Sequence, residues 1–166
     1  EVLWPRLLAD AASGSLQPVY RNEGPVDPAL APVPRWALMR ERRYLFTNTL
    51  CAGRGCPWRC EFCYNSSRNL DARYRMKPVD HIVAEIASLG LSHVMFIDDN
   101  FIGNPARAAE LADRLGRMGS TWHAAVSADL LRHGDLLDRM ADSGCRSLFI
   151  GFETLNPDAL RGCRKV

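Results

Sequence analysis

Three cysteines lie close together in the segment CPWRCEFC at positions 56–63. Three residues separate Cys56 from Cys60 and two separate Cys60 from Cys63, so one short turn carries all three thiols. A cubane iron–sulfur cluster usually takes four thiolates, and three would leave one of its irons open. An open iron can bind and reduce a substrate or cosubstrate, whereas a fully ligated cluster mainly passes electrons. We therefore interpret Cys56, Cys60 and Cys63 as metal ligands at a site of chemistry.

Two other chemistries account for clustered cysteines. Structural zinc prefers four ligands, commonly as two Cys-x-x-Cys pairs or as a mixture of Cys and His. Here the nearby fourth candidate is Cys51, no second pair follows, and the four histidines share no ligand spacing. A disulfide would leave one clustered thiol unpaired, and no signal peptide indicates an oxidising compartment. The pattern favours an iron–sulfur site, with a non-catalytic zinc or iron–sulfur module as an alternative.

The composition is that of a soluble, globular unit of about one domain. The chain has 166 residues, 47% of them hydrophobic, and a formal net charge of +2. No apolar run is long enough to span a membrane, so we expect a cytoplasmic protein. The sequence starts at Glu1 instead of Met, which indicates either processing or a piece of a longer protein.

Basic residues predominate around the cysteines. Between positions 35 and 77 there are ten Arg and Lys residues, and only Glu41, Glu61 and Asp71 oppose them. Such an excess could line a phosphate-binding groove. We favour the interpretation that some of these basic residues surround an anionic cluster and its cosubstrate, and that the others are ordinary surface arginines.

The chain divides near position 40. Residues 1–40 are predicted to form a linker between domains, because a short helix at 3–12 is followed by five prolines between positions 18 and 34. Strands and helices then alternate, which predicts parallel pairing with right-handed crossovers. Strands are expected at 44–50, 93–97, 121–126 and 146–152, and helices at 80–89, from Asn104 onward, at 135–143 and from Asn156 onward.

Polar residues follow the expected strands. The first strand leads into the cysteines, Asp98, Asp99 and Asn100 follow the second, Ser127 the third and Glu153 the fourth. Active-site groups of parallel α/β barrels cluster at these carboxyl ends. Carboxylate, amide and hydroxyl groups there could bind a polar cosubstrate. Strand ends are also commonly solvated and polar, so the prediction depends on their shared location.

The pattern Cys-x3-Cys-x-aromatic-Cys, with Phe62 as the aromatic residue between an expected strand and helix, resembles the signature of the radical S-adenosylmethionine (SAM) superfamily. Residues 73–78, 96–104 and 149–154 and the proline-rich leader resemble the subgroup with an N-terminal cobalamin-binding domain, which includes hopanoid methylases. The resemblance covers nearly the whole chain. It implies an α/β fold, a partial (β/α) TIM-like barrel in which residues 41–166 supply about four of six strand–helix units as an open, curved parallel sheet.

The resemblance also implies cofactors. Cys56, Cys60 and Cys63 would hold a [4Fe-4S] cluster whose open iron chelates SAM, and an electron from a donor such as flavodoxin or ferredoxin would pass through it to cleave SAM to a 5'-deoxyadenosyl radical. No catalytic side chain beyond these ligands is implied. Cobalamin would be bound by a domain absent from this chain, which lacks an Asp-x-His-x-x-Gly pattern.

Six further residues are placed at SAM by their position in the family pattern. Phe62 would lie near the adenine, Asp98 to Asn100 in the place of the motif that binds the methionine amino group, and Ser127 and Glu153 against the sugar or tail. The cofactor-binding residues expected from the resemblance are therefore Phe62, Asp98, Asp99, Asn100, Ser127 and Glu153.

The expected activity is that of a cobalamin-type methyltransferase, or a related enzyme of lipid or secondary metabolism, with a small-molecule or lipid substrate. The arginine-rich stretch suggests an alternative, a tRNA methylthiotransferase. That class usually has extra cysteines in an N-terminal domain, and no cysteine precedes Cys51 here. The sequence therefore argues against a nucleic-acid substrate.

Overall fold

The computed structural model describes residues 3–22, 24–38, 48–67 and 73–165. Its central feature is a parallel sheet with the order β1-β4-β5-β6, formed by β1 (Thr49–Leu50), β4 (His93–Phe96), β5 (Thr121–Ser127) and β6 (Cys145–Gly151). Strands β1 and β6 are its two edges. The sheet is open and parallel, as the sequence predicts. The ends of β4, β5 and β6 lie within one residue of the expected positions. Positions 44–47 of the first expected strand lie outside the described residues.

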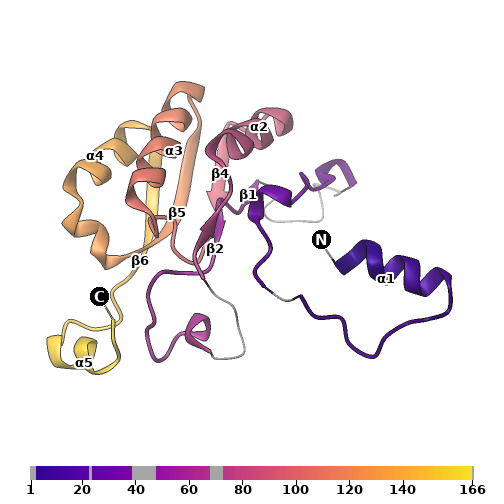
Figure 1. Cartoon of the computed structure of the whole chain (residues 1–166). Coiled ribbons are helices and arrows are strands. Elements are labelled where there is room, and N and C mark those ends of the chain that lie inside the picture. The colour runs from indigo at the N-terminus through magenta and orange to yellow at the C-terminus, as the bar shows by residue number, and fades with distance from the viewer. Residues whose placement is uncertain (1–2, 23, 39–47, 68–72, 166) are drawn as a thin grey trace.

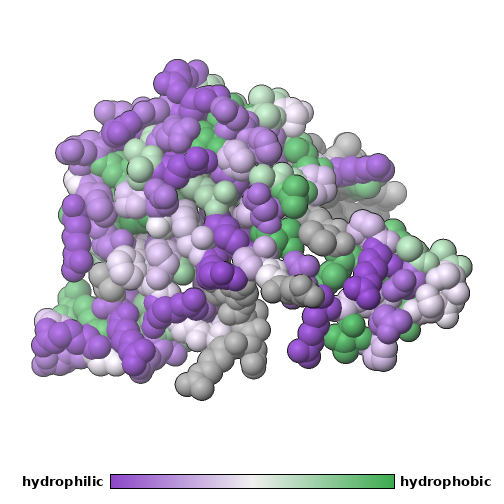
Figure 2. All heavy atoms as spheres, viewed as in Figure 1, coloured by the Kyte–Doolittle hydropathy of each residue, from purple (hydrophilic) through white to green (hydrophobic). Residues whose placement is uncertain are grey.

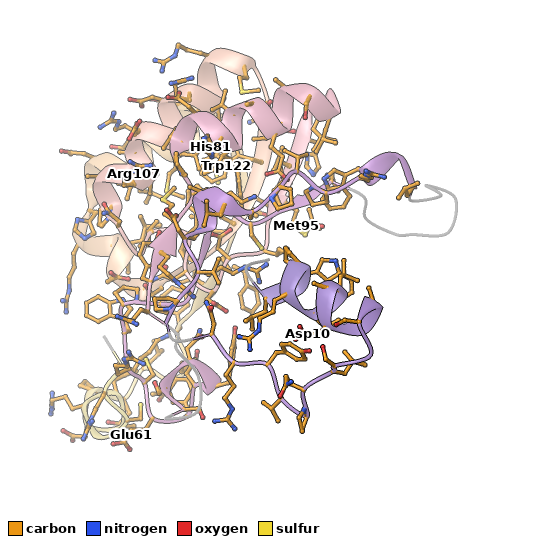
Figure 3. All side chains as sticks on the ribbon, turned by 45° about the vertical axis from the view of Figure 1, so that its right-hand side comes forward. Asp10, Glu61, His81, Met95, Arg107 and Trp122 are labelled. Carbon is orange, nitrogen blue, oxygen red and sulfur yellow. The ribbon has the colours of Figure 1, made fainter. Side chains whose placement is uncertain are left out.

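Three helices connect the strands and pack along one face of the sheet (Figure 1). They are α2 (Val79–Leu89), α3 (Pro105–Met118) and α4 (Gly134–Asp142). Their apolar sides and alternate strand residues form the core, in which the rings of Phe96, Phe101 and Trp122 lie 4.9 to 5.9 Å apart between centroids. Trp122 lies between the helices and the sheet in Figure 3, and its indole N–H donates to the Ser143 carbonyl at 3.2 Å.

Helix boundaries follow local signals that the sequence contains. The Asn104 side chain accepts a hydrogen bond from the Arg107 amide at 3.1 Å, with Pro105 at the first helical position. Asn156 caps α5 (Pro157–Gly162) in the same way. Helix α2 ends at Gly90, which has a left-handed φ of 61°. The beginnings of α3 and α5 and the end of α2 are therefore confirmed as predicted.

The opposite face of the sheet has no helix on it among the described residues. Ile97 and Phe149 are 55% and 79% exposed. His93 and His123 also lie on this face, with ring centroids 4.7 Å apart, and each Nδ1 contacts a hydroxyl group, of Thr121 and Ser147 respectively. Sequence spacing did not reveal this pair, because only the pairing of neighbouring parallel strands brings the rings together.

The N-terminal segment lies beside the sheet. Helix α1 (Leu3–Ala12) forms as predicted and stands apart from the other helices (Figure 1). It leads into a chain with short 3-10 turns at Pro28–Leu30 and Trp36–Leu38. Trp4 and Leu8 of α1 are 60% and 49% exposed, and Figure 2 shows hydrophobic surface on the part of the molecule that α1 forms. The expected domain boundary at 40/41 lies outside the described residues. Among the described residues, no helix is long and apolar enough to cross a membrane.

The cysteine segment is flanked by a two-stranded antiparallel sheet that the sequence did not predict. Strand β2 (Gly53–Arg54) pairs with β3 (Arg75–Met76). A 3-10 turn at Tyr64–Ser66 directly follows the cysteines, and the expected helix at 80–89 is present further on as α2. A Cβ atom at Gly53 would lie 2.8 Å from the Arg75 carbonyl oxygen, so glycine is needed for the two strands to approach.

Gly144 provides a test of the α4–β6 connection. Its φ is 95°, and a Cβ atom there would lie 2.5 Å from the backbone oxygen of Ser120. We expect Gly144→Ala to lower the free energy of unfolding by about 2 kcal/mol, since it adds a backbone clash to an unfavourable φ. Gly134→Ala is the matched control, because nothing lies within 4 Å of the added atom. Equal denaturation midpoints for the two variants would contradict this account.

Candidate functional site

The three cysteines lie on the loop between β2 and β3, at the edge where the parallel strands end. All three are free thiols; Cys60 is buried, and Cys56 and Cys63 are half-buried. The amide of Cys63 donates to the Cys60 carbonyl at 3.1 Å, and the Ser66 amide donates to the Cys63 carbonyl at 2.9 Å. These turns hold the thiols on one compact loop.

The thiols influence one another electrostatically. Burial raises the pKa of Cys56, and the nearby Cys63 raises it further, while hydrogen bonds from the Trp58 amide and the Asn100 side chain oppose the rise. Burial also raises the pKa of Cys60, and Lys165 is the main opposing group. Because a bound metal deprotonates a coordinating thiol outright, ligation would overcome this raised pKa.

The donor set fits an iron–sulfur cluster. Within the described residues, no three His, Cys, Asp or Glu side chains converge as the ligands of a single metal ion do. The thiolates of a four-iron cluster bind separate irons, so they need not meet at one point. Soft thiolate donors suit iron–sulfur clusters, as they also suit zinc and copper(I). Cys56, Cys60 and Cys63 are therefore the residues that could hold a cluster.

Asp98, directly after β4, holds the chain that leads into the cysteine loop. Its carboxylate accepts hydrogen bonds from the amide of Ala52, at 2.9 Å, and from the amide of Gly53. The side chain is buried, and this burial raises the pKa of Asp98 to about 6. Both oxygens thus face the protein backbone, a different placement from the contact with the methionine amino group that the resemblance implies.

Asp99 connects the two ends of the cysteine loop. One carboxylate oxygen accepts from the Gly55 amide at 2.9 Å, and the other accepts from the Tyr64 hydroxyl. That hydrogen bond raises the pKa of Tyr64. Asp99 is exposed, so its carboxylate also faces solvent at this edge. Sequence reasoning missed Tyr64, whose only signal was its position directly after Cys63.

Asn100 and Ser127 join the ends of β4 and β5 to the cysteine loop. The Asn100 amide nitrogen lies 2.9 Å from Ser127 Oγ and 3.8 Å from Cys56 Sγ, and its oxygen accepts from the Ser127 amide at 3.3 Å. The Ser127 hydroxyl in turn donates to Asp129. Asn100, Ser127 and Asp129 are all buried. The structure thus brings together three predicted site residues, Asn100, Ser127 and Cys56.

Glu153, after β6, approaches the loop through Lys165. Glu153 has a φ of 61°, in the left-handed region that non-glycine residues rarely adopt. Its Oε1 lies 3.7 Å from the Lys165 ammonium, and the Lys165 side chain is only 11% exposed. A Cβ atom at Gly151 would lie 3.0 Å from Glu153 Oε1 and 3.1 Å from Lys165 Nζ, so glycine leaves room for this pair. Lys165 was missed because it lies beyond the last expected helix start.

The segment after α5 also contacts the cysteine loop directly. The Glu61 amide donates to the Cys163 carbonyl at 3.0 Å, and the Glu61 carboxylate lies 3.4 Å from Arg164 Nε. Figure 3 shows Glu61 beside α5. Residues separated by about one hundred positions therefore form one local structure around the cysteines.

Comparison with known proteins identifies the family. The family model described as the radical SAM superfamily matches residues 50–166. The chain belongs to the radical SAM superfamily. It is 29% identical over 99% of its length to a bacteriochlorophyllide d C-12(1)-methyltransferase of Chlorobaculum tepidum and 30% identical over 96% of its length to a hopanoid C-2 methylase of Rhodopseudomonas palustris. The chain spans only 38% and 32% of these two relatives.

The fold is also that of a solved radical SAM protein. The structure of the radical SAM methyltransferase TsrM from Kitasatospora setae, with cobalamin and a [4Fe-4S] cluster bound, matches 72% of this chain with a TM-score of 0.62 and 20% identity. The match covers 24% of the TsrM chain. The open parallel sheet is therefore part of a radical SAM barrel, as the sequence predicts.

Two features of this radical SAM chain lie beside the site. Phe62 is exposed on the cysteine loop, where the family pattern has its aromatic residue. A cavity of about 590 Å³ lies between the proline-rich segment and β1–β3, and its lining includes Cys51 and the ion pair of Lys77 and Glu85 at 2.8 Å, but none of the three clustered cysteines.

Of the described basic residues, Arg59 donates to the Asn65 carbonyl at 3.2 Å and so supports the loop.

The raised pKa of Asp98 predicts a pH dependence of stability. A carboxyl with a pKa of about 6 in the folded protein, against about 4 when unfolded, binds its proton more tightly when folded. Its contribution to the free energy of unfolding is therefore greatest below about pH 4 and declines as the pH rises through about 6. Asp98→Asn cannot ionise, so this decline should be absent from the variant.

The measurement is denaturant unfolding of the cluster-free protein at a series of pH values. The difference in unfolding free energy between wild type and Asp98→Asn should change with pH between about 4 and 6 and be constant above that range. A difference that stays constant over the whole range would show that burial does not perturb Asp98.

Proposed function

We propose that the protein containing this chain is a radical SAM methyltransferase of the cobalamin-binding group. The observation that carries the proposal is the attachment of the cysteine loop to the polar ends of β4 and β5, through Asp98, Asp99 and Asn100. A loop held in this way presents a cluster at the edge of the sheet where a cosubstrate can reach it. The named methyltransferase relatives, which align with nearly all of the chain, support the reaction class.

The chain's residues would divide the work as follows. Cys56, Cys60 and Cys63 hold the cluster, which when bound supplies an electron for the reductive cleavage of SAM. Burial of Cys60 limits the access of water and oxygen to that ligand. The exposed carboxylates of Asp99 and Glu153 can accept hydrogen bonds from the ammonium and hydroxyl groups of SAM.

The proposal also involves a linker, a cobalamin-binding domain and an electron donor. Residues 1–40 would link the barrel to a preceding domain that binds cobalamin, and a flavodoxin or ferredoxin would donate the electron. The names of two relatives refer to a bacteriochlorophyllide and a hopanoid, which supports a small-molecule or lipid substrate. A reducing compartment, the cytoplasm, would protect the thiolates.

Metal analysis tests the cluster. Anaerobic reconstitution of the full-length protein should give a brown protein with about four irons per chain at this site and a reducible electron paramagnetic resonance signal, bleached by air. Cys60→Ala should lose the cluster. Cys145→Ala, on β6 at the start of the strand, should keep it. Stoichiometric zinc with no iron uptake would refute the proposal and support a zinc module.

SAM binding tests the strand ends. Asp99→Ala and Glu153→Ala should each weaken SAM binding by roughly 1 to 3 kcal/mol, the range for losing a hydrogen bond to a charged group. Iron content is measured in the same samples, since Asp99 also holds the cysteine loop. Asp113→Ala, which removes an ion pair with Arg139 on the outer helices, is the control. Wild-type affinity in both test variants would remove these residues from the SAM site.

A further inference from the structure

We propose that Asn100 is a positioning residue for the cluster ligand Cys56, to whose sulfur its side-chain amide donates a hydrogen bond. This inference rests on the proposed function, because it assigns a partner to one ligand of the cluster. Its basis is a chain of four side chains, from Asp129 through Ser127 and Asn100 to Cys56. The family pattern instead suggests a contact between Asn100 and SAM.

The orientation of the Asn100 amide follows from its partners. The Ser127 backbone N–H is a donor, so the atom that faces it at 3.3 Å must be the Asn100 carbonyl oxygen. The amide nitrogen is then the atom 2.9 Å from Ser127 Oγ and 3.8 Å from Cys56 Sγ. The Ser127 hydroxyl gives its own proton to Asp129, so it accepts from Asn100. One consistent set of donors and acceptors thus directs an N–H at Cys56.

The burial of Asn100 favours hydrogen bonds to neighbouring protein groups over contact with a cosubstrate that diffuses in. Its side chain is only 1% exposed. The three contacts already use its oxygen and both of its N–H groups. A SAM molecule would have to displace Ser127 or Cys56 to reach it. Asp99, one residue earlier, is exposed and can serve that purpose instead.

A hydrogen bond to a ligating thiolate has an electronic consequence. It stabilises negative charge on the sulfur, and hydrogen bonds to the sulfurs are among the factors that set cluster reduction potentials. Partners of this kind also orient metal ligands. The ligands of this loop have different polar neighbours, since Lys165 acts on Cys60 while Asn100 acts on Cys56. Loss of the Asn100 donor should therefore make the cluster harder to reduce.

The test is the midpoint potential of the cluster in the reconstituted full-length protein, followed by electron paramagnetic resonance without SAM. Asn100→Leu removes the donor without adding charge, and Asn100→Asp replaces the NH2 group by an oxygen. Both should shift the potential to more negative values while about four irons are retained. Asn104→Asp makes the same chemical change at the cap of α3, where aspartate also accepts from the Arg107 amide, and should leave the potential unchanged.

A second variant keeps the inference falsifiable if the Asn100 variants lose the cluster. Ser127→Ala leaves Asn100 in place but removes its hydroxyl acceptor, so the amide is less well oriented and a smaller negative shift is expected. Ser147→Ala, whose hydroxyl contacts His123 in the middle of the sheet, is the matched control. An unshifted potential in Ser127→Ala and in every Asn100 variant that keeps its iron would overturn this inference alone. A wild-type protein that takes up no iron would overturn the proposed function as well.

Discussion

The hydrogen bonds between the end of β4 and the cysteine loop are the interactions on which the site depends. Three consecutive side chains bind three parts of this region: Asp98 binds the amides of Ala52 and Gly53 at the start of β2, Asp99 binds the two ends of the loop, and Asn100 binds a cysteine sulfur. The loop has little regular structure beyond its own turns, so these hydrogen bonds fix its position against the end of β4. Thiols on a loop held in this way are already arranged before a cluster binds, which lowers the entropic cost of assembling the site.

These interactions come at an energetic cost that the fold offsets locally. Burial disfavours the ionised form of Asp98, as its raised pKa shows, and two backbone amides compensate in part. Lys165 is likewise largely buried, with Glu153 as its partner. Both groups lie at the edge of the sheet where strands end, and both bear on the cysteine loop. Buried charges of this kind concentrate where a protein prepares a site for chemistry.

The architecture explains why the cysteine loop between β2 and β3 and a segment after β6 can build one site. Parallel pairing brings every carboxyl end to the same edge, so residues far apart in sequence meet there. The helices cover one face of the sheet and leave this edge accessible (Figure 1). Membership of the radical SAM superfamily is consistent with this architecture, because the fold is shared with a radical SAM methyltransferase of low sequence identity.

The sequence by itself determined the features that depend on near neighbours. The spacing of Cys56, Cys60 and Cys63 predicts cluster ligands, and caps such as Asn104 and Gly90 marked the helix ends, because these signals act within a turn or two of chain. Only the tertiary structure decided how Asp98, Asp99 and Asn100 divide their roles, paired β2 with β3, and joined Lys165 to Glu153. Those outcomes depend on which strands become neighbours and on how deeply each side chain is buried, and neither is encoded in local spacing.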